Sequence, residues 1–206
     1  MGDKVDFRKA MKPLYGPTIR QGLHIVDVPP MRFLMIDGKG DPNTAGNYRD
    51  ALETLYPVAY AIKFASKTEL GRDYVVPPLE GLWWADDMKT FITREKGKWQ
   101  WTMMLMVPEW VGPKVIDAAI AKVGGKKNAP KALDKLRVEL LEEGKAVQVL
   151  HVGSYDDEGP VLDKMHREFI PAQGLTTVGK HHEIYLSDPR RVAAAKLKTV
   201  LRQPVR

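Results

Sequence analysis

Hydrophobic and polar residues alternate along several short segments of the chain, with the period expected of half-buried β-strands. The alternation and its flanking turn residues predict strands over about residues 31–37, 79–85, 99–107, 137–141, 146–152, 180–187 and 199–205. Apolar residues at helical spacing predict the main helices over 48–66, 113–123 and 160–171. Pro57 lies inside the first of these helices and is expected to kink or divide it.

The order of these predicted elements repeats. Residues 31–107 read as strand, helix, strand, strand, and residues 146–205 read the same way. Two such units side by side would form one sheet. We therefore predict an α+β fold of tandem strand–helix–strand–strand repeats in one antiparallel sheet, with helices on one face and a ligand groove on the other. The predicted single domain, 1–206, divides into an extended N-terminal arm (1–30), a first repeat (31–112), connecting helices and a strand (113–145) and a second repeat (146–206).

Large soft side chains gather in the first repeat. Four of the five tryptophans lie between residues 83 and 101, and three of the nine methionines lie in the strand 99–107. Both faces of that strand carry bulky residues, with Trp101 and Met103 on one of them. A buried core would explain this density. An adaptable surface that accepts ligands of several shapes is the alternative.

The segment HHEIYLSDP (181–189) places a carboxylate on a half-buried strand. If Ile184 and Leu186 face the core, alternation sets His181, Glu183, Tyr185 and Ser187 on the other side. Such a face is either solvated or the polar floor of a ligand site. In the first repeat, Glu80 and Trp84 share one side of the strand equivalent to 180–187 in the repeat. On the preceding helix, Tyr56 is either a core aromatic or a ligand contact.

Composition narrows the chemistry. The chain has 206 residues, 44% of them hydrophobic, and contains no cysteine, which excludes disulfides, thiolate metal sites and cysteine nucleophiles. The net charge is +6, but the basic residues are scattered along the chain and do not gather on one helix that could bind a nucleic-acid groove. No signal peptide or membrane-spanning run is evident, so we expect a cytoplasmic protein that does not insert into membranes.

Several common types of site are not expected. The loop after residue 38 lacks the glycine spacing of a phosphate-binding or dinucleotide-binding motif, and no cofactor is expected. His181 and His182 face opposite sides of a regular strand, so no metal site is expected. Ser154 lacks a nucleophile elbow. Asp156, Asp157 and Glu158 are interpreted as an acidic cluster at a helix start.

Five segments taken together resemble a known family over nearly the whole chain, from about residue 5 to the end. They are PPMRFLMIDGKGDPN, DYVVPPLEGLWW, WQWTMMLMVPEW, KLRVELLEEGKAVQVLHVGSYDDEGP and GKHHEIYLSDPRR. The chain is similar to stand-alone proteins of the gyrase-inhibitor-like (GyrI-like) small-molecule-binding superfamily. The resemblance implies a tandem strand–helix–strand–strand fold with a ligand groove between the repeats.

The resemblance also implies a function. Related domains are effector domains of multidrug-sensing transcription regulators, in which a buried glutamate on the strand matching EIYLSDP pairs with cationic aromatic drugs; here that residue is Glu183. Some stand-alone relatives hydrolyse cyclopropane-bearing DNA-alkylating compounds with groove Glu, Tyr and Trp residues. The first 30 residues are too short and proline-rich for a helix-turn-helix module, so no direct DNA binding is expected.

These arguments lead to the hypothesis of a site for small hydrophobic or cationic aromatic ligands. The expected catalytic residues are Glu183, which orients or deprotonates water, and a tyrosine, Tyr155 or Tyr185, whose hydroxyl donates to the substrate oxygen. The expected ligand contacts are Glu80, Trp84, Trp101, Tyr56, Met103 and His181. A drug-sequestering or effector-sensing protein without enzymatic activity and a protein-interaction module remain alternatives, and both a monomer and a homodimer are compatible with the sequence.

Overall fold

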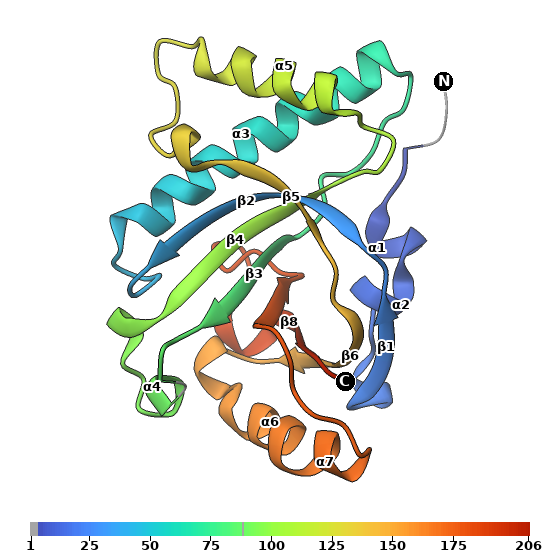
Figure 1. The fold of residues 1–206 in the computed structure, drawn as a ribbon, viewed down its shortest axis with the longest axis vertical. Helices are drawn as coiled ribbons and strands as arrows, with labels where there is room; N and C mark the ends of the chain where they lie inside the picture. The colour runs from blue at the N-terminus through green and yellow to red at the C-terminus, as the bar shows by residue number, and fades with distance from the viewer. Residues whose placement is uncertain (1–3, 88) are drawn as a thin grey trace.

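The computed structural model describes residues 4–87 and 89–206; residues 1–3 of the expected arm lie outside this part. Within it, the strands form one antiparallel sheet in the order β1-β6-β8-β7-β3-β4-β2-β5. The strands are β1 (His24–Val28), β2 (Met31–Lys39), β3 (Leu79–Trp84), β4 (Gln100–Val107), β5 (Arg137–Leu141), β6 (Gly144–Val152), β7 (His181–Tyr185) and β8 (Lys198–Pro204). The sheet is strongly curled, as Figure 1 shows.

The two predicted repeats are present and are arranged about the centre of the sheet. Strands β2, β4 and β3 come from the first repeat, and β6, β8 and β7 from the second. The third elements of the two repeats, β3 and β7, pair with each other at the centre, where Gly81 lies opposite Glu183. This confirms the predicted α+β fold with a duplicated strand–helix–strand–strand unit.

Helices and short helical turns connect the strands. They are α1 (Phe7–Ala10), α2 (Lys12–Tyr15), η1 (Ile19–Gln21), α3 (Gly46–Glu69), α4 (Lys89–Ile92), η2 (Lys96–Lys98), α5 (Pro113–Gly124), η3 (Leu133–Lys135), η4 (Tyr155–Asp157), α6 (Gly159–Lys164), the π-helical turn η5 (Met165–Phe169), α7 (Ile170–Ala172) and η6 (Ala194–Lys196). Helix α3 is not divided at Pro57, contrary to one of the two expected outcomes. Pro57 is exposed, so the helical hydrogen bond that it removes lies on the solvent side.

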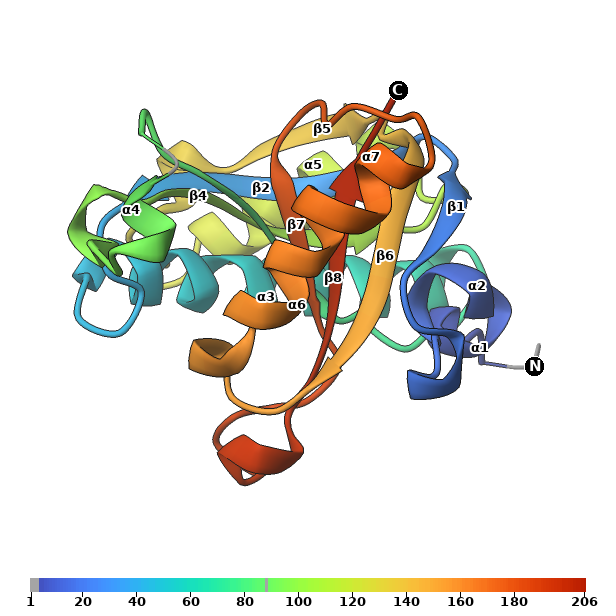
Figure 2. The ribbon, with the colours of Figure 1, turned by 90° about the horizontal axis from the view of Figure 1, so that it is seen from below.

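One face of the sheet, called here the outer face, carries the long helices. Apolar residues of β2 and β4 pack against α3 and α5, and those of β6 and β8 pack against α6, η5 and α7. Because the sheet curls, the two groups of helices lie on opposite sides of the molecule in Figures 1 and 2. The central strands β3 and β7 run between them.

The opposite face, called here the inner face, is closed by the N-terminal segment. Phe7, Leu14 and Tyr15 pack there against a cluster that includes Met104 and Ile184. The structure differs here from the extended arm that the sequence predicts. Residues 7–15 form two helical turns, and residues 24–28 form the edge strand β1. Isolated four-residue helices are unstable, so burial against the sheet has to stabilise them.

No helix in the described ranges is both long enough and apolar enough to span a membrane.

Candidate functional site

Glu183 lies at the centre of the outer face, on β7. Its side chain is 14% exposed. The Tyr185 hydroxyl, two residues along the same strand, donates a hydrogen bond of 2.8 Å to Glu183 Oε2. The Trp83 indole of β3 in turn donates to the Tyr185 hydroxyl oxygen at 2.9 Å. Alternation on β7 and pairing with β3 thus join Glu183 and Tyr185, both expected from the sequence, to the indole of Trp83.

Gly81 makes this arrangement possible. It lies directly opposite Glu183, and a Cβ atom built at Gly81 would be 2.9 Å from Trp83 Nε1 and 3.1 Å from the Tyr185 hydroxyl oxygen. Both distances are shorter than those that side chains normally tolerate. Glycine at this position therefore leaves the space in which the indole and the phenol meet beside the carboxylate.

A second carboxylate, Glu158, reaches the same region from the start of α6. It is only 5% exposed, and it does not cap the helix through its side chain. Its Oε1 atom has no hydrogen-bond partner among the described residues. The neighbouring Tyr155 ring packs edge-on against Tyr185, with centroids 5.8 Å apart. The turn that begins α6 therefore brings a phenol and a carboxyl group to the Glu183 region.

The two carboxyl groups are electrostatically linked. Burial raises the pKa of Glu183 above its ordinary range, although the hydrogen bond from Tyr185 opposes the shift. Burial, and then the charge of Glu183, raises the pKa of Glu158 further still. Glu158 is thus the group that keeps its proton near neutral pH, and Glu183 is the group that ionises first.

Aromatic and basic side chains surround the pair. Burial, and then the charge of Glu183, raise the pKa of Tyr48 on α3. The Tyr48 ring packs edge-on against Trp101, with ring centroids 5.1 Å apart. Burial raises the pKa of Tyr155 to about 12, so its hydroxyl stays protonated. Arg94, held by an ion pair with Asp156, lowers the pKa of both glutamates by its charge, against the larger effect of burial.

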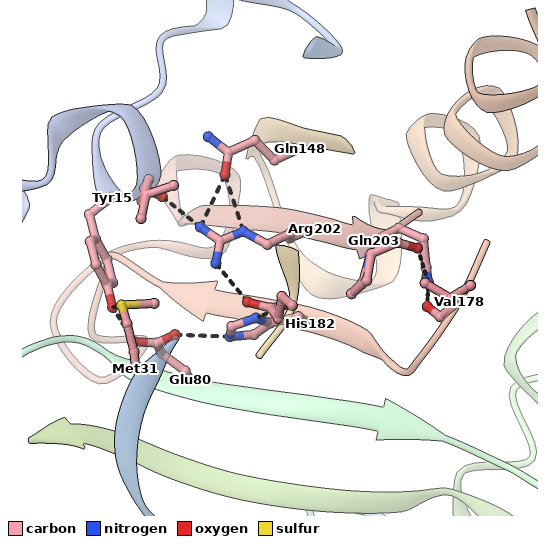
Figure 3. A network of polar contacts seen from close by, with 11 residues as sticks. Tyr15, Met31, Glu80, Gln148, Val178, His182, Arg202 and Gln203 are labelled. Atoms are coloured by element: carbon pink, nitrogen blue, oxygen red, sulfur yellow. Dashed lines mark hydrogen bonds and ion pairs between the residues drawn. The ribbon is translucent and has the colours of Figure 1, made fainter. Parts of the chain in front are cut away.

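The inner face behind Glu183 carries a different polar network, shown in Figure 3. The His182 ring contacts Glu80 Oε2 and Glu143 Oε1, each at 2.9 Å. Tyr15 donates to Glu80 Oε1 at 2.8 Å, and Arg202 contacts Glu143 Oε2 at 3.1 Å. Burial alone would lower the pKa of His182, but the two carboxylates raise it to about 9. The network is therefore ionised and internally paired.

The expected ligand contacts are thus divided between the two faces. Glu80 is fully buried in the inner network, and Trp84 lies on the same inner side, with the Lys180 ammonium 3.3 Å from its ring centroid. Neither lies on the face that carries Glu183, so the structure does not bring these two expected contacts together with Glu183. The physical reason is register: Glu80 pairs with Ile184, one residue out of step, and one step reverses the face.

The remaining expected contacts lie on the outer face. His181 is 3.7 Å from Glu183, measured from Nε2 to Oε1. Met103 lies beside Gly81, and Trp101 is fully buried over Gly38. Tyr56 is partly buried on α3. The Glu183 region lies on the helix-bearing face, between α3 and α6, whereas the sequence placed the ligand groove on the opposite face.

Sequence reasoning missed three contributors. The sequence indicates an acidic helix start at Glu158, and it assigns neither Tyr48 nor Trp83 to the site. The signal for Glu158 was the tyrosine three residues earlier, since Tyr155 and Glu158 lie in one helical turn. Among the described residues, no group of three or more imidazole and carboxylate side chains is placed to hold a metal ion.

A family model described as the GyrI-like small-molecule binding domain matches residues 23–206. The chain belongs to this family. This assignment agrees with the fold described above and with the sequence resemblance. The GyrI-like domain is a small-molecule binding domain. The search of curated proteins finds no match.

Solved structures extend the comparison. An uncharacterised conserved protein from Listeria innocua is 39% identical over 98% of this chain and all of that chain, with a TM-score of 0.89. A protein from the same organism described as a hydrolase is 37% identical over 99% of this chain and all of that chain, with a TM-score of 0.86. The C-terminal domain of EcmrR shares the fold at 12% identity, over 89% of this chain and 96% of that domain, with a TM-score of 0.55.

Proposed function

We propose that the protein binds lipophilic, cationic aromatic molecules at the outer face, where Glu183 and Glu158 lie among aromatic side chains. The observation that carries the proposal is this pair of buried carboxyl groups, one of which has an oxygen atom without a partner in the described structure. A buried carboxylate without a matching cation is unfavourable. A bound cation would remove that cost.

The aromatic shell suits the same ligands. Tyr48, Tyr155, Tyr185 and Trp83 offer ring surfaces around the carboxylates. A cation over such a ring gains about 0.5–2 kcal/mol. Because the Glu183 side chain is only 14% exposed, a ligand of the size of a dye enters only if aromatic side chains rotate away from it.

We further propose that the site adds water to strained electrophiles, in particular cyclopropane-bearing alkylators. Two features support this second proposal. The two carboxyl groups differ in proton affinity, as a general base and a general acid require. In addition, a protein from Listeria innocua that is 37% identical to this chain is described as a hydrolase.

The proposed reaction uses only these groups and water. Glu183 accepts a proton from a water molecule while the water oxygen bonds to a ring carbon of the cyclopropane. The strained carbon–carbon bond breaks, and its electron pair moves onto a conjugated carbonyl oxygen of the substrate. Glu158, or the Tyr155 hydroxyl, supplies a proton to that oxygen. A proton then passes from Glu183 to the group that donated, so the net change is the addition of one water molecule.

The test pairs binding with turnover in matched variants. A planar cationic dye is titrated by fluorescence into the wild type, Glu183→Gln and Glu80→Gln, and loss of a cyclopropane-bearing alkylator is followed by chromatography with the same proteins. Glu80→Gln is the control because it also removes a buried carboxylate, but on the inner face. We expect Glu183→Gln to weaken dye binding at least about tenfold and to abolish turnover. Correctly folded Glu80→Gln should retain both.

The outcomes separate the alternatives. Dye binding that depends on Glu183, without turnover by the wild type, would leave a sequestering or sensing protein. Neither binding nor turnover in the wild type would contradict both proposals and favour the protein-interaction module. Equal losses of dye binding in Glu183→Gln and Glu80→Gln would contradict the assignment of the binding site to the outer face.

A further inference from the structure

His181 and His182 are neighbours in the chain, yet within the described part of the structure only His182 has hydrogen-bond partners. The ring nitrogens of His182 contact Glu80 and Glu143 on the inner face. Both ring nitrogens of His181 are buried and have no partner anywhere in residues 4–87 and 89–206. The nearest carboxylate oxygen, on Glu183, is 3.7 Å from Nε2, too far for a hydrogen bond.

A buried imidazole without partners is unfavourable in a folded protein, since water would have satisfied both nitrogens in the unfolded chain. Burial, and then the neighbouring His166 and His182, lower the pKa of His181 to about 3. The ring is therefore neutral near pH 7. It carries one donor and one acceptor, both unused.

The position of His181 suggests what would use them. It lies two residues before Glu183 on β7, so both side chains project from the outer face, and it lies opposite Trp83 of β3. The π-helical turn η5, which carries His166, belongs to the helical layer over the same face. Such turns often occur at functional sites. A molecule that rests on Glu183 would have its edge beside His181.

We propose that His181 is a specificity-determining residue, which hydrogen-bonds to an amino or hydroxyl substituent on the ring system of a ligand held by Glu183. The inference rests on the proposed function of the outer face and deepens it. It names the ligand class as planar aromatic cations that carry hydrogen-bonding substituents. Cations of the same shape without such substituents gain the charge and stacking contacts, but not the contact with His181.

Two acridinium dyes provide matched probes. Proflavine carries two primary amino groups, and acridine orange carries dimethylamino groups in their place, while both are planar cations at pH 7. Affinities of both dyes are measured by fluorescence titration with the wild type, His181→Phe, His181→Gln and Glu183→Gln. His181→Phe keeps a flat ring but removes both nitrogens. His181→Gln keeps a donor and an acceptor.

The expected result is a change in discrimination. His181→Phe should weaken proflavine binding about three- to tenfold, the size of one hydrogen bond, and leave acridine orange within about twofold. His181→Gln should recover part of the preference for proflavine. Glu183→Gln should weaken both dyes together, because both present a cation.

Each contrary result has a distinct meaning. If His181→Phe weakens both dyes equally, or neither, the role assigned to His181 is wrong while the proposed binding function stands. If neither dye binds the wild type, or Glu183→Gln binds both as tightly as the wild type, the proposed function fails and this inference fails with it. If His181→Phe does not fold, His181→Gln decides the question: a reduced preference for proflavine supports the assignment, and an unchanged preference contradicts it.

Discussion

The two faces of β7 bury charged groups in opposite ways. On the inner face, Glu80 and Glu143 meet the cations of His182 and Arg202, and every one of these groups has a partner. On the outer face, Glu183 stands near a second carboxyl group rather than against a close cation. The strand β7 contributes to both arrangements through two adjacent residues, His182 on the inner face and Glu183 on the outer face.

The difference separates a structural network from a binding site. The inner charges are matched within the protein, so they tie the N-terminal segment to the sheet: Gln148 donates to the Pro13 carbonyl at 2.7 Å, and Arg202 donates to that of Leu14 at 3.0 Å. The outer carboxyl groups are buried without such compensation. An unmatched buried group is a cost to the free protein that a ligand can remove.

The largest expected effect is the difference in stability between two variants, in which one or the other of the adjacent histidines is replaced by phenylalanine. His182→Phe leaves Glu80 without its cationic partner and should lower the free energy of unfolding by about 3–5 kcal/mol, as breaking a buried ion pair does. His181→Phe should change it by less than about 1 kcal/mol, because no hydrogen bond is lost. Urea unfolding followed by circular dichroism measures both. Similar losses in the two variants would contradict the contrast between the faces.

A smaller effect, of opposite sign, is expected at Glu158. Its folded-state pKa is raised above the ordinary value of 4.5, so the folded protein binds the extra proton. The stability contributed by this proton is fully present below about pH 4.5 and is lost as the pH rises through the raised pKa. Glu158→Gln removes this loss.

We expect Glu158→Gln to be about 1–3 kcal/mol more stable than the wild type at pH 8, with the difference vanishing near pH 4. Urea unfolding at the two pH values measures it. Glu80→Gln, the inner-face control, should be less stable than the wild type at pH 8, because its negative charge is needed beside His182. A destabilised Glu158→Gln would mean that Glu158 has a structural partner.

The smallest effects distinguish the two tyrosines that donate to carboxylates. Tyr15→Phe should cost about 1–2 kcal/mol of stability, since it removes the hydrogen bond to buried Glu80. It should leave dye binding unchanged. Thermal unfolding and fluorescence titration test the two statements, and weakened dye binding would link the inner face to the site.

Tyr185→Phe should act on titration instead. The Tyr185 hydroxyl stabilises ionised Glu183, so its removal raises the pKa of that carboxyl further. Cation binding requires the ionised form and strengthens as the pH rises through this pKa. The midpoint of dye binding against pH should therefore move upward by about one unit. An unchanged or lower midpoint would contradict the assigned hydrogen bond.

Much of the fold followed from local pattern. Alternation located the strands of both repeats, and the repeated element order predicted their antiparallel sheet. The helical conformation of the N-terminal segment was not predicted, because two helical turns such as Phe7–Ala10 and Lys12–Tyr15 have little stability of their own. Burial of Phe7, Leu14 and Tyr15 against the inner face stabilises them, and that contact is not visible in their own sequence.

Alternation along the strand is enough to place Glu183, Tyr185 and His181 on one face, since side chains alternate whatever the surroundings. Which residues that face contacts depends on how distant strands and helices pack together. Pairing of β3 with β7 set Gly81, not Glu80, opposite Glu183, and so sent the two glutamates to different faces. The start of α6 places the buried Glu158 side chain near Glu183, over the outer face. Register and helix placement depend on contacts between distant segments, which no local pattern contains.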